Sequence, residues 1–218
     1  MLACRHTLLY DSHFAVAVAV AVAVAVLYRA AGVPVLHDPN QDNTDLEKCL
    51  DEVLLRLQSK EEGSGSGSGA TVLVVGGFDG SFHHDMGNLH VLFRYAGVFH
   101  RTLLLGRTVL AELLHGPESA EKGLGEMNNL PLMRHELRLA TAAEGPICGL
   151  YPVRQPCALV RTQGLKWNID CALEFGCSIS TSNQIIGCDT EACDDTALVV
   201  VETSHTLLWT QGYKLGIL

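Results

Sequence analysis

Two carboxylates three residues apart, Asp42 and Asp45, form the acidic pair best placed to do chemistry in this sequence. They precede a segment in which apolar residues recur every three or four positions, which predicts a helix from Asp45, and Thr44 with Glu47 makes a T-x-x-E capping box there. Mg²⁺ takes oxygen ligands from one or two such carboxylates plus phosphates. Asp45 also has a simpler explanation, because an acid in a first helical turn is favourable by ~0.3–1 kcal/mol without any metal. Spacing alone favours the simpler explanation.

A glycine turn is the second candidate for binding chemistry. The apolar, β-branched segment 71–75 predicts a strand, and Gly76, Gly77 and Gly80 follow it before a second helix-like segment. In α/β folds, ligands bind at the carboxyl ends of such strands. The turn is not G-x-G-x-x-G, so two interpretations stay equally open: phosphate binding, or glycines that only permit a tight turn.

The elements that position these residues change character near Arg107. Residues 1–107 are typical of a partial α/β domain, whereas residues 108–218 hold several short strand-like segments separated by Gly, Pro and Asn. We therefore expect an incomplete α/β N-terminal domain followed by an antiparallel β-sandwich. The Ala-Val repeat 15–26 is too short for a membrane span and predicts neither helix nor strand, because both of its residues are apolar. The Gly/Ser run 63–69 has the composition of a flexible linker.

The net charge and the cysteine spacing argue against several classes of protein. The net charge is -9 at pH 7, without a Lys/Arg-rich stripe, which argues against a nucleic-acid partner. Eight cysteines are scattered without a C-x-x-C pair, so the spacing of a structural zinc site is absent. A chain of 218 residues is large enough to fold without disulfides, and free thiols in a reducing, cytoplasmic compartment are favoured over a disulfide framework. No membrane association is expected.

Four motifs in the second half occur in the order and approximate spacing of eukaryotic thiamine pyrophosphokinases. They are C-G-L-Y-P-V with Q-P-C at 148–157, T-Q-G-L-K-W-N at 162–168, S-T-S-N at 180–183, and V-E-T with L-L-W-T at 201–210. In the first half, N-Q-D-N-T-D at 40–45 resembles the family's D-Q-D-x-T-D signature, and residues 76–88 resemble its glycine turn and following helix. The resemblance covers most of the chain from about Tyr28.

The resemblance implies transfer of a pyrophosphoryl group from ATP to thiamine, giving thiamine diphosphate and AMP. It implies Mg²⁺ at Asp42 and Asp45 and phosphate contacts at the three glycines. It also implies a homodimer with thiamine bound between subunits. Thiamine carries a cationic thiazolium and a flat pyrimidine, so the residues expected to bind it are one aromatic and several small polar ones: Trp167, Ser180, Ser182, Asn183 and Gln41. Trp209 also matches the family, and we interpret it as a packing residue.

The sequence departs from the family in two places. Only Asp11 and Asp38 precede Asp42, so an upstream acidic pair of the family is missing, and Ser81 and His83 stand where the family has Arg and Asp. These departures leave a second hypothesis open: a non-catalytic, thiamine-binding homodimer. A third interpretation is that repeat sequence has replaced the true N-terminal part of the protein.

Overall fold

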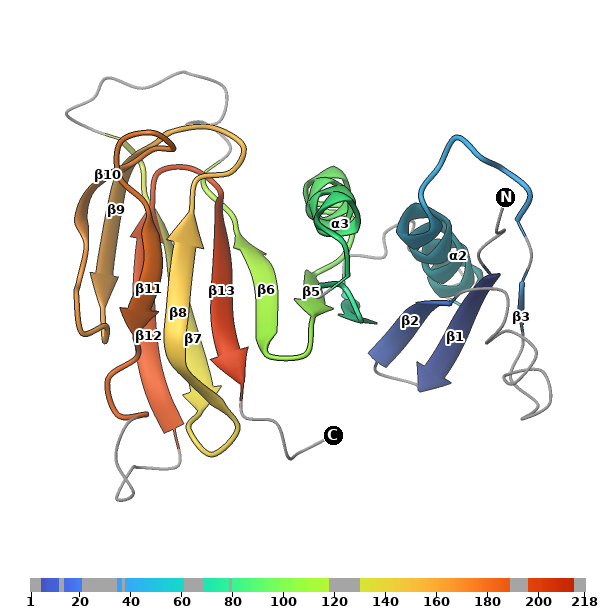
Figure 1. Cartoon of the computed structure of the whole chain (residues 1–218), viewed down its shortest axis with the longest axis horizontal. Helices are drawn as coiled ribbons and strands as arrows, with labels where there is room; N and C mark the ends of the chain where they lie inside the picture. The colour runs from blue at the N-terminus through green and yellow to red at the C-terminus, as the bar shows by residue number, and fades with distance from the viewer. Residues whose placement is uncertain are drawn as a thin grey trace. The chain divides into compact units, whose positions relative to one another are not determined.

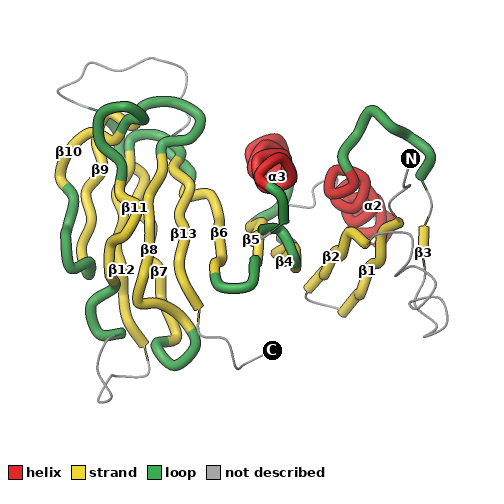
Figure 2. Tube along the Cα trace, in the orientation of Figure 1, coloured by secondary structure: helices red, strands yellow, loops and turns green. Residues whose placement is uncertain are grey.

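The computed structural model describes residues 5–11, 14–20, 35–36, 38–60, 69–78, 80–117, 130–188 and 196–213. The second half of the Ala-Val repeat and most of the Gly/Ser run lie outside these residues. The chain divides into two compact units, Met1–Arg107 and Thr108–Leu218. Each unit is described by itself (Figures 1 and 2).

The first unit is built on a mixed sheet with the strand order β3-β1-β2-β4-β5. Its strands are β1 (Arg5–Asp11), β2 (Phe14–Val20), β3 (Val35–Leu36), β4 (Thr71–Val75) and β5 (Arg101–Leu105). β1 pairs antiparallel with β2 and β3, whereas β4 pairs parallel with both β2 and β5. The first half of the Ala-Val repeat therefore forms a strand, which its sequence did not predict. The pairing partners on both sides of β2 supply the backbone hydrogen bonds that select this conformation.

Among the described residues of this unit, two helices lie on the same side of its sheet (Figure 1). The first, α2 (Asp45–Lys60), begins at the predicted residue. The second, α3 (Phe82–Arg94), connects β4 to β5. The capping box at the start of α2 is formed, because the Thr44 N–H donates to Glu47 Oε2 at 2.6 Å and the Glu47 N–H donates to the Thr44 hydroxyl at 3.2 Å. The α/β prediction is thus confirmed for this unit.

The buried carboxylate of Glu47 joins the two helices. Its Oε1 accepts a hydrogen bond from Arg94 Nη1 at 2.5 Å, and the Tyr95 hydroxyl donates to Asp51 Oδ1 at 2.5 Å. Burial of Glu47 acts to raise its pKa, but the hydrogen bonds with Thr44 and the positive charge of Arg94 outweigh it, and the pKa lies below its ordinary value. The start of α2 is therefore fixed to the end of α3 by charge as well as by packing.

The second unit is the expected antiparallel β-sandwich. One sheet has the order β6-β13-β8-β11 and the other β7-β12-β9-β10. The strands are β6 (Val109–Leu114), β7 (Met133–Ala140), β8 (Glu144–Tyr151), β9 (Cys157–Gln163), β10 (Asp170–Leu173), β11 (Ser180–Gln184), β12 (Thr196–Thr203) and β13 (Leu207–Tyr213). Alternate residues of strands such as β12 point inward, so their apolar side chains meet between the sheets.

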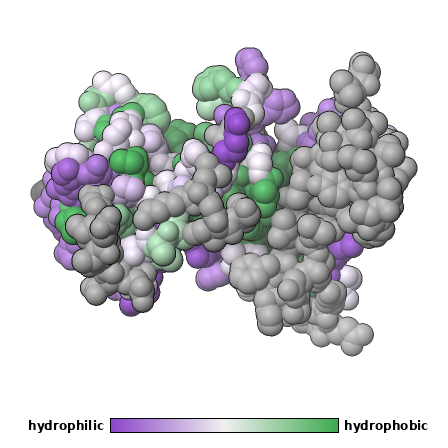
Figure 3. Space-filling view, turned by 60° about the horizontal axis from the view of Figure 1, so that its bottom comes forward, coloured by the Kyte–Doolittle hydropathy of each residue, from purple (hydrophilic) through white to green (hydrophobic). Residues whose placement is uncertain are grey.

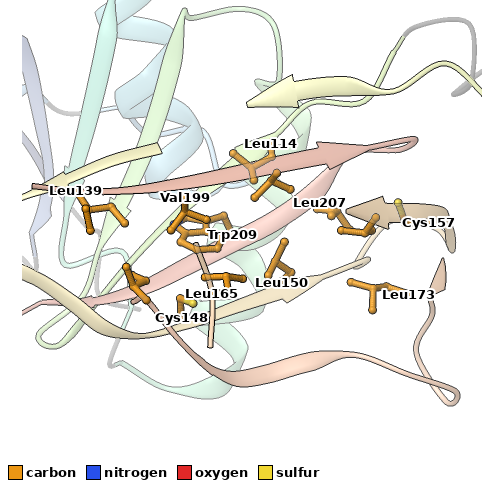
Figure 4. Close-up of a cluster of buried hydrophobic side chains, with 14 of the residues drawn as sticks. Leu114, Leu139, Cys148, Leu150, Cys157, Leu165, Leu173, Val199, Leu207 and Trp209 are labelled. Carbon is orange, nitrogen blue, oxygen red and sulfur yellow. The ribbon is translucent and has the colours of Figure 1, made fainter. Parts of the chain in front are cut away.

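Trp209 lies at the centre of the sandwich core, near Leu150, Leu165 and Val199 (Figure 4). It is fully buried, and its indole N–H donates to Gln211 Oε1 at 2.9 Å, which satisfies its polar atom. The interpretation of Trp209 as a packing residue agrees with this position.

On the surface in the left part of Figure 3, which belongs to the sandwich, hydrophilic and hydrophobic residues are interspersed rather than gathered into one apolar face. Within the described part of the chain, no helix is both long enough and apolar enough to span a bilayer.

Candidate functional site

A tight turn between β9 and β10 presents Trp167 to solvent. The turn is fixed from inside by Thr162 and Asn168: the Ile169 N–H donates to the Thr162 hydroxyl at 2.8 Å, and the Leu165 N–H donates to Asn168 Oδ1 at 3.1 Å. Leu165 is buried in the core, whereas Trp167, two residues on, is 54% exposed. The core therefore anchors one end of the turn while the indole stays accessible to a ligand.

The side-chain amide of Asn183 on β11 holds Trp167 from the neighbouring strand. Asn183 Oδ1 accepts from the Trp167 N–H at 3.2 Å, and Asn183 Nδ2 donates to the Trp167 carbonyl at 2.8 Å. The same amide also contacts the Ser180 hydroxyl at 3.4 Å and accepts from the Gln184 N–H at 2.9 Å. Asn183 is only 4% exposed, so its amide is buried and occupied by protein partners. Its geometry suits positioning of the indole.

Four of the five residues predicted to bind thiamine lie on this turn and the adjoining strand. Trp167, Ser180 and Asn183 are in contact, and Ser182 is exposed on the same strand, with its hydroxyl 3.4 Å from that of Thr181. The fifth, Gln41, lies in the first unit. Its amide nitrogen donates to the carbonyls of Pro39 and Asn40 at 3.2 and 3.4 Å.

A lysine contacts the exposed indole. Lys166 Nζ lies 4.8 Å from the centroid of the Trp167 ring and donates to Gln184 Oε1 at 2.7 Å. The Lys166 N–H also donates to the Gln184 carbonyl at 2.8 Å. Side chain and backbone together thus keep the ammonium on the indole, a cation–π arrangement that the sequence did not indicate.

The two predicted metal ligands lie at the start of α2. Asp42 is exposed and its N–H donates to Asn40 Oδ1 at 2.8 Å, while the half-buried Asp45 carboxylate is 3.8 Å from Lys48 Nζ. Among the described residues, no group of three or more His, Cys, Asp or Glu could hold a metal ion by itself. Two carboxylates do fit a Mg²⁺ that arrives with phosphate oxygens, because this ion takes few ligands from the protein.

The glycine turn lies where β4 and β5 end. Both the Gly76 and the Gly77 N–H groups donate to the Leu105 carbonyl, at 2.8 and 3.0 Å, so they close the sheet. Gly76 has φ +79°, a conformation that favours glycine. A Cβ added to Gly77 would lie only 3.0 Å from the Cβ of Leu104. Backbone geometry alone therefore accounts for these two glycines, and phosphate binding at Gly76, Gly77 and Gly80 stays a prediction. His83 and His84 are exposed in the first turn of α3.

Comparison with known proteins decides the family. A model of the thiamin pyrophosphokinase catalytic domain matches residues 20–103, and a model of the thiamin pyrophosphokinase vitamin B1 binding domain matches residues 134–204. The chain belongs to the thiamin pyrophosphokinase family. The two matches fall in the two structural units, in the order that the sequence motifs indicated.

Plant thiamine pyrophosphokinases are among the relatives. Thiamine pyrophosphokinase 1 of Arabidopsis thaliana is 34% identical over 179 residues, which cover 82% of this chain and 55% of that protein. Thiamine pyrophosphokinase 1 of Oryza sativa subsp. japonica is 33% identical over 175 residues, covering 80% and 54%. The chain thus spans about half the length of these relatives.

Solved structures of thiamin pyrophosphokinases share the fold. The enzyme from Candida albicans superposes with a TM-score of 0.66 at 14% identity, covering 89% of this chain and 71% of that one. The yeast enzyme superposes with a TM-score of 0.61 at 17% identity, covering 88% and 66%. At such low identity these similarities establish the α/β and β-sandwich architecture alone.

Proposed function

We propose that this protein is a thiamine diphosphokinase, which transfers a pyrophosphoryl group from ATP to thiamine and releases thiamine diphosphate and AMP. The observation that carries the proposal is the exposed indole of Trp167, held by Asn183 within a motif order that matches the family. A tryptophan in a β-sandwich is usually core, as Trp209 is. An indole that is anchored and still half exposed is instead available to a ligand.

Thiamine would bind with its cationic ring system against Trp167, where a cation over an indole is worth ~0.5–2 kcal/mol. Ser180 and Ser182 supply hydroxyls for the pyrimidine, and Gln41 supplies an amide. Asn183 contributes by fixing the indole, because its own amide is occupied. A family homodimer, with thiamine bound between the copies, is part of this proposal.

ATP would bind with Mg²⁺ at Asp42 and Asp45, with its phosphates near Gly76, Gly77 and Gly80. Mg²⁺ would neutralise the charge of the triphosphate. The carboxylates at the start of α2 hold their position through the capping box and the ion pair of Glu47 with Arg94. Catalysis would then be mainly positioning and charge neutralisation. The six described cysteines are thiols, which fits the reducing, cytoplasmic compartment that we propose.

The test is AMP release by the purified protein given thiamine, ATP and Mg²⁺. We expect AMP above a blank that lacks thiamine, and a kcat/KM for Trp167→Ala that is lower by about 2- to 30-fold. Phe175→Ala is the matched control, because Phe175 is 55% exposed against 54% for Trp167 and has no assigned role. AMP no higher than the blank would overturn the enzymatic proposal.

Ser81 and His83 favour a second candidate, a thiamine-binding protein without transferase activity. Both residues are exposed at the start of α3, where the family has an Arg and an Asp. A neutral serine does not screen a triphosphate, and histidine is a poor ligand for Mg²⁺. Calorimetry separates the two candidates: binding of thiamine without measurable binding of ATP and Mg²⁺ supports the second.

A further inference from the structure

The exposed platform of Trp167 already carries a positive charge. The Lys166 ammonium lies 4.8 Å from the centre of the indole, and its hydrogen bond to Gln184 Oε1, at 2.7 Å, keeps it there. Gln184 is neutral, so the charge of Lys166 is not cancelled by the group that holds it. Any ligand that stacks on Trp167 is therefore bound beside an ammonium group.

The surroundings of Lys166 contrast with those of the arginines on the same unit. Arg161 pairs with Asp170 at 3.0 Å, Arg134 with Glu202 at 3.5 Å, and Arg138 with Glu136 at 3.5 Å. Among the residues that the structure describes, no carboxylate forms an ion pair with Lys166. Within the described part of the chain, the platform thus combines an aromatic face with a cation that has no carboxylate partner.

We propose that Lys166 sets the charge preference of this platform, disfavouring unmodified thiamine and favouring its phosphorylated forms. The inference rests on the proposed function, because it assumes that thiamine stacks on Trp167. Thiamine brings a second positive charge next to the ammonium, which repels it. Thiamine diphosphate brings phosphate oxygens on a flexible arm, and an ammonium is a good point-charge partner for phosphate. The same lysine would oppose the substrate and retain the product.

The magnitude follows from the separation of the charges. At about 7 Å, in a half-exposed site whose dielectric is close to that of water, one unit charge changes affinity roughly threefold. The thiazolium is common to both ligands, so its repulsion cancels in the ratio of their dissociation constants. The diphosphate adds roughly two or more negative charges, so this ratio changes by about tenfold when the lysine charge is removed. Higher salt reduces this difference, because screening weakens both interactions.

The experiment is calorimetric titration of the full chain with thiamine and with thiamine diphosphate, in EDTA so that no metal links phosphate to the carboxylates. For Lys166→Gln we expect tighter binding of thiamine and weaker binding of thiamine diphosphate. Lys166→Arg keeps the charge and should restore the wild-type ratio. Arg138→Gln removes a charge from β7, at the far edge of the sheet that contains β9 and β10, and should leave the ratio unchanged.

The outcomes separate this inference from the proposed function. If thiamine binds and Lys166→Gln leaves the ratio of the two dissociation constants unchanged, the inference is wrong and the proposed function stands. If the wild-type protein binds neither ligand, the proposed function itself is wrong. A change in ratio that Arg138→Gln reproduces would also overturn the inference, because a general loss of charge would then explain it.

Discussion

Asn183 binds the backbone of Trp167 at both its N–H and its carbonyl, at 3.2 and 2.8 Å. The amide that does so is 4% exposed, whereas the indole that it holds is 54% exposed. A buried polar group that is fully hydrogen-bonded is costly to disturb, because its partners then lose their bonds as well. The exposed aromatic is therefore held through buried hydrogen bonds to its own backbone.

Asn183→Ala tests this relationship. It leaves the N–H and the carbonyl of Trp167 without their side-chain partners, and we expect the free energy of unfolding to fall by about 2–3 kcal/mol. The indole should also become more mobile, with lower steady-state fluorescence anisotropy of Trp167 in a Trp209→Phe background. Ser182→Ala removes an exposed hydroxyl of the same strand. It should change the free energy of unfolding by no more than ~0.5 kcal/mol and leave the anisotropy of Trp167 unchanged. Equal effects of the two substitutions would contradict the positioning role.

A glycine pair tests how tightly the turn packs. Gly164 and Gly176 both have φ +86°, so alanine is strained at either position. A Cβ on Gly164 would lie 2.2 Å from the Leu198 carbonyl oxygen, whereas a Cβ on Gly176 would meet nothing within 4 Å. We expect Gly176→Ala to cost about 1 kcal/mol and Gly164→Ala about 2 kcal/mol more, measured by urea unfolding. Similar losses would mean that the turn can move away from β12.

Local periodicity predicted the elements of the first unit that have strong sequence signals. The apolar spacing predicted that a helix begins at Asp45, where α2 begins. The β-branched segment predicted a strand from Thr71 to Val75, which are the bounds of β4. The Ala-Val repeat had no such signal, since an all-apolar segment is compatible with helix or strand. Its strand conformation depends on pairing with the adjacent strand β1 and with β4, which is distant in the sequence.

The candidate site was only partly predictable for a similar reason. The motif order placed Trp167, Ser180 and Asn183 together, and the structure joins them by hydrogen bonds. The sequence did not indicate that Asn183 is buried or that Lys166 lies on the indole. Both depend on the register between the turn and β11, where Leu165 pairs with Ile185, and a sequence pattern carries no register between distant segments.

Glu47 should make the free energy of unfolding depend on pH in the acidic range. Its pKa is lower in the folded state than its ordinary value of 4.5, so its contribution is complete above that value and is lost as the pH falls through the lower folded pKa. We expect Glu47→Gln to lower the free energy of unfolding by about 1–2 kcal/mol at pH 7 and to narrow the difference from wild type below about pH 4. Urea unfolding at both pH values measures this.

Glu52→Gln is the control for that comparison. Its ion pair with Arg56, at 2.7 Å, is half-exposed on the same helix and should contribute less than ~0.5 kcal/mol. A Glu47 variant that loses no more stability than the Glu52 variant would show that the link between α2 and α3 contributes little.

Substitutions of three aspartates near the start of α2 distinguish binding of Mg²⁺ from stabilisation of the helix. Asp45→Asn should cost the helix only ~0.3–1 kcal/mol. If Asp42 and Asp45 hold Mg²⁺, Asp42→Asn and Asp45→Asn should each lower kcat/KM by about 10²-fold and raise the Mg²⁺ concentration needed for half-maximal activity. Asp38→Asn is the control, because this exposed carboxylate in the same loop accepts the Asn40 N–H, at 2.8 Å, and asparagine can still accept it. If the three variants keep equal activity and the same Mg²⁺ dependence, the carboxylates at 42 and 45 serve only the loop and the helix, and the metal must be held elsewhere.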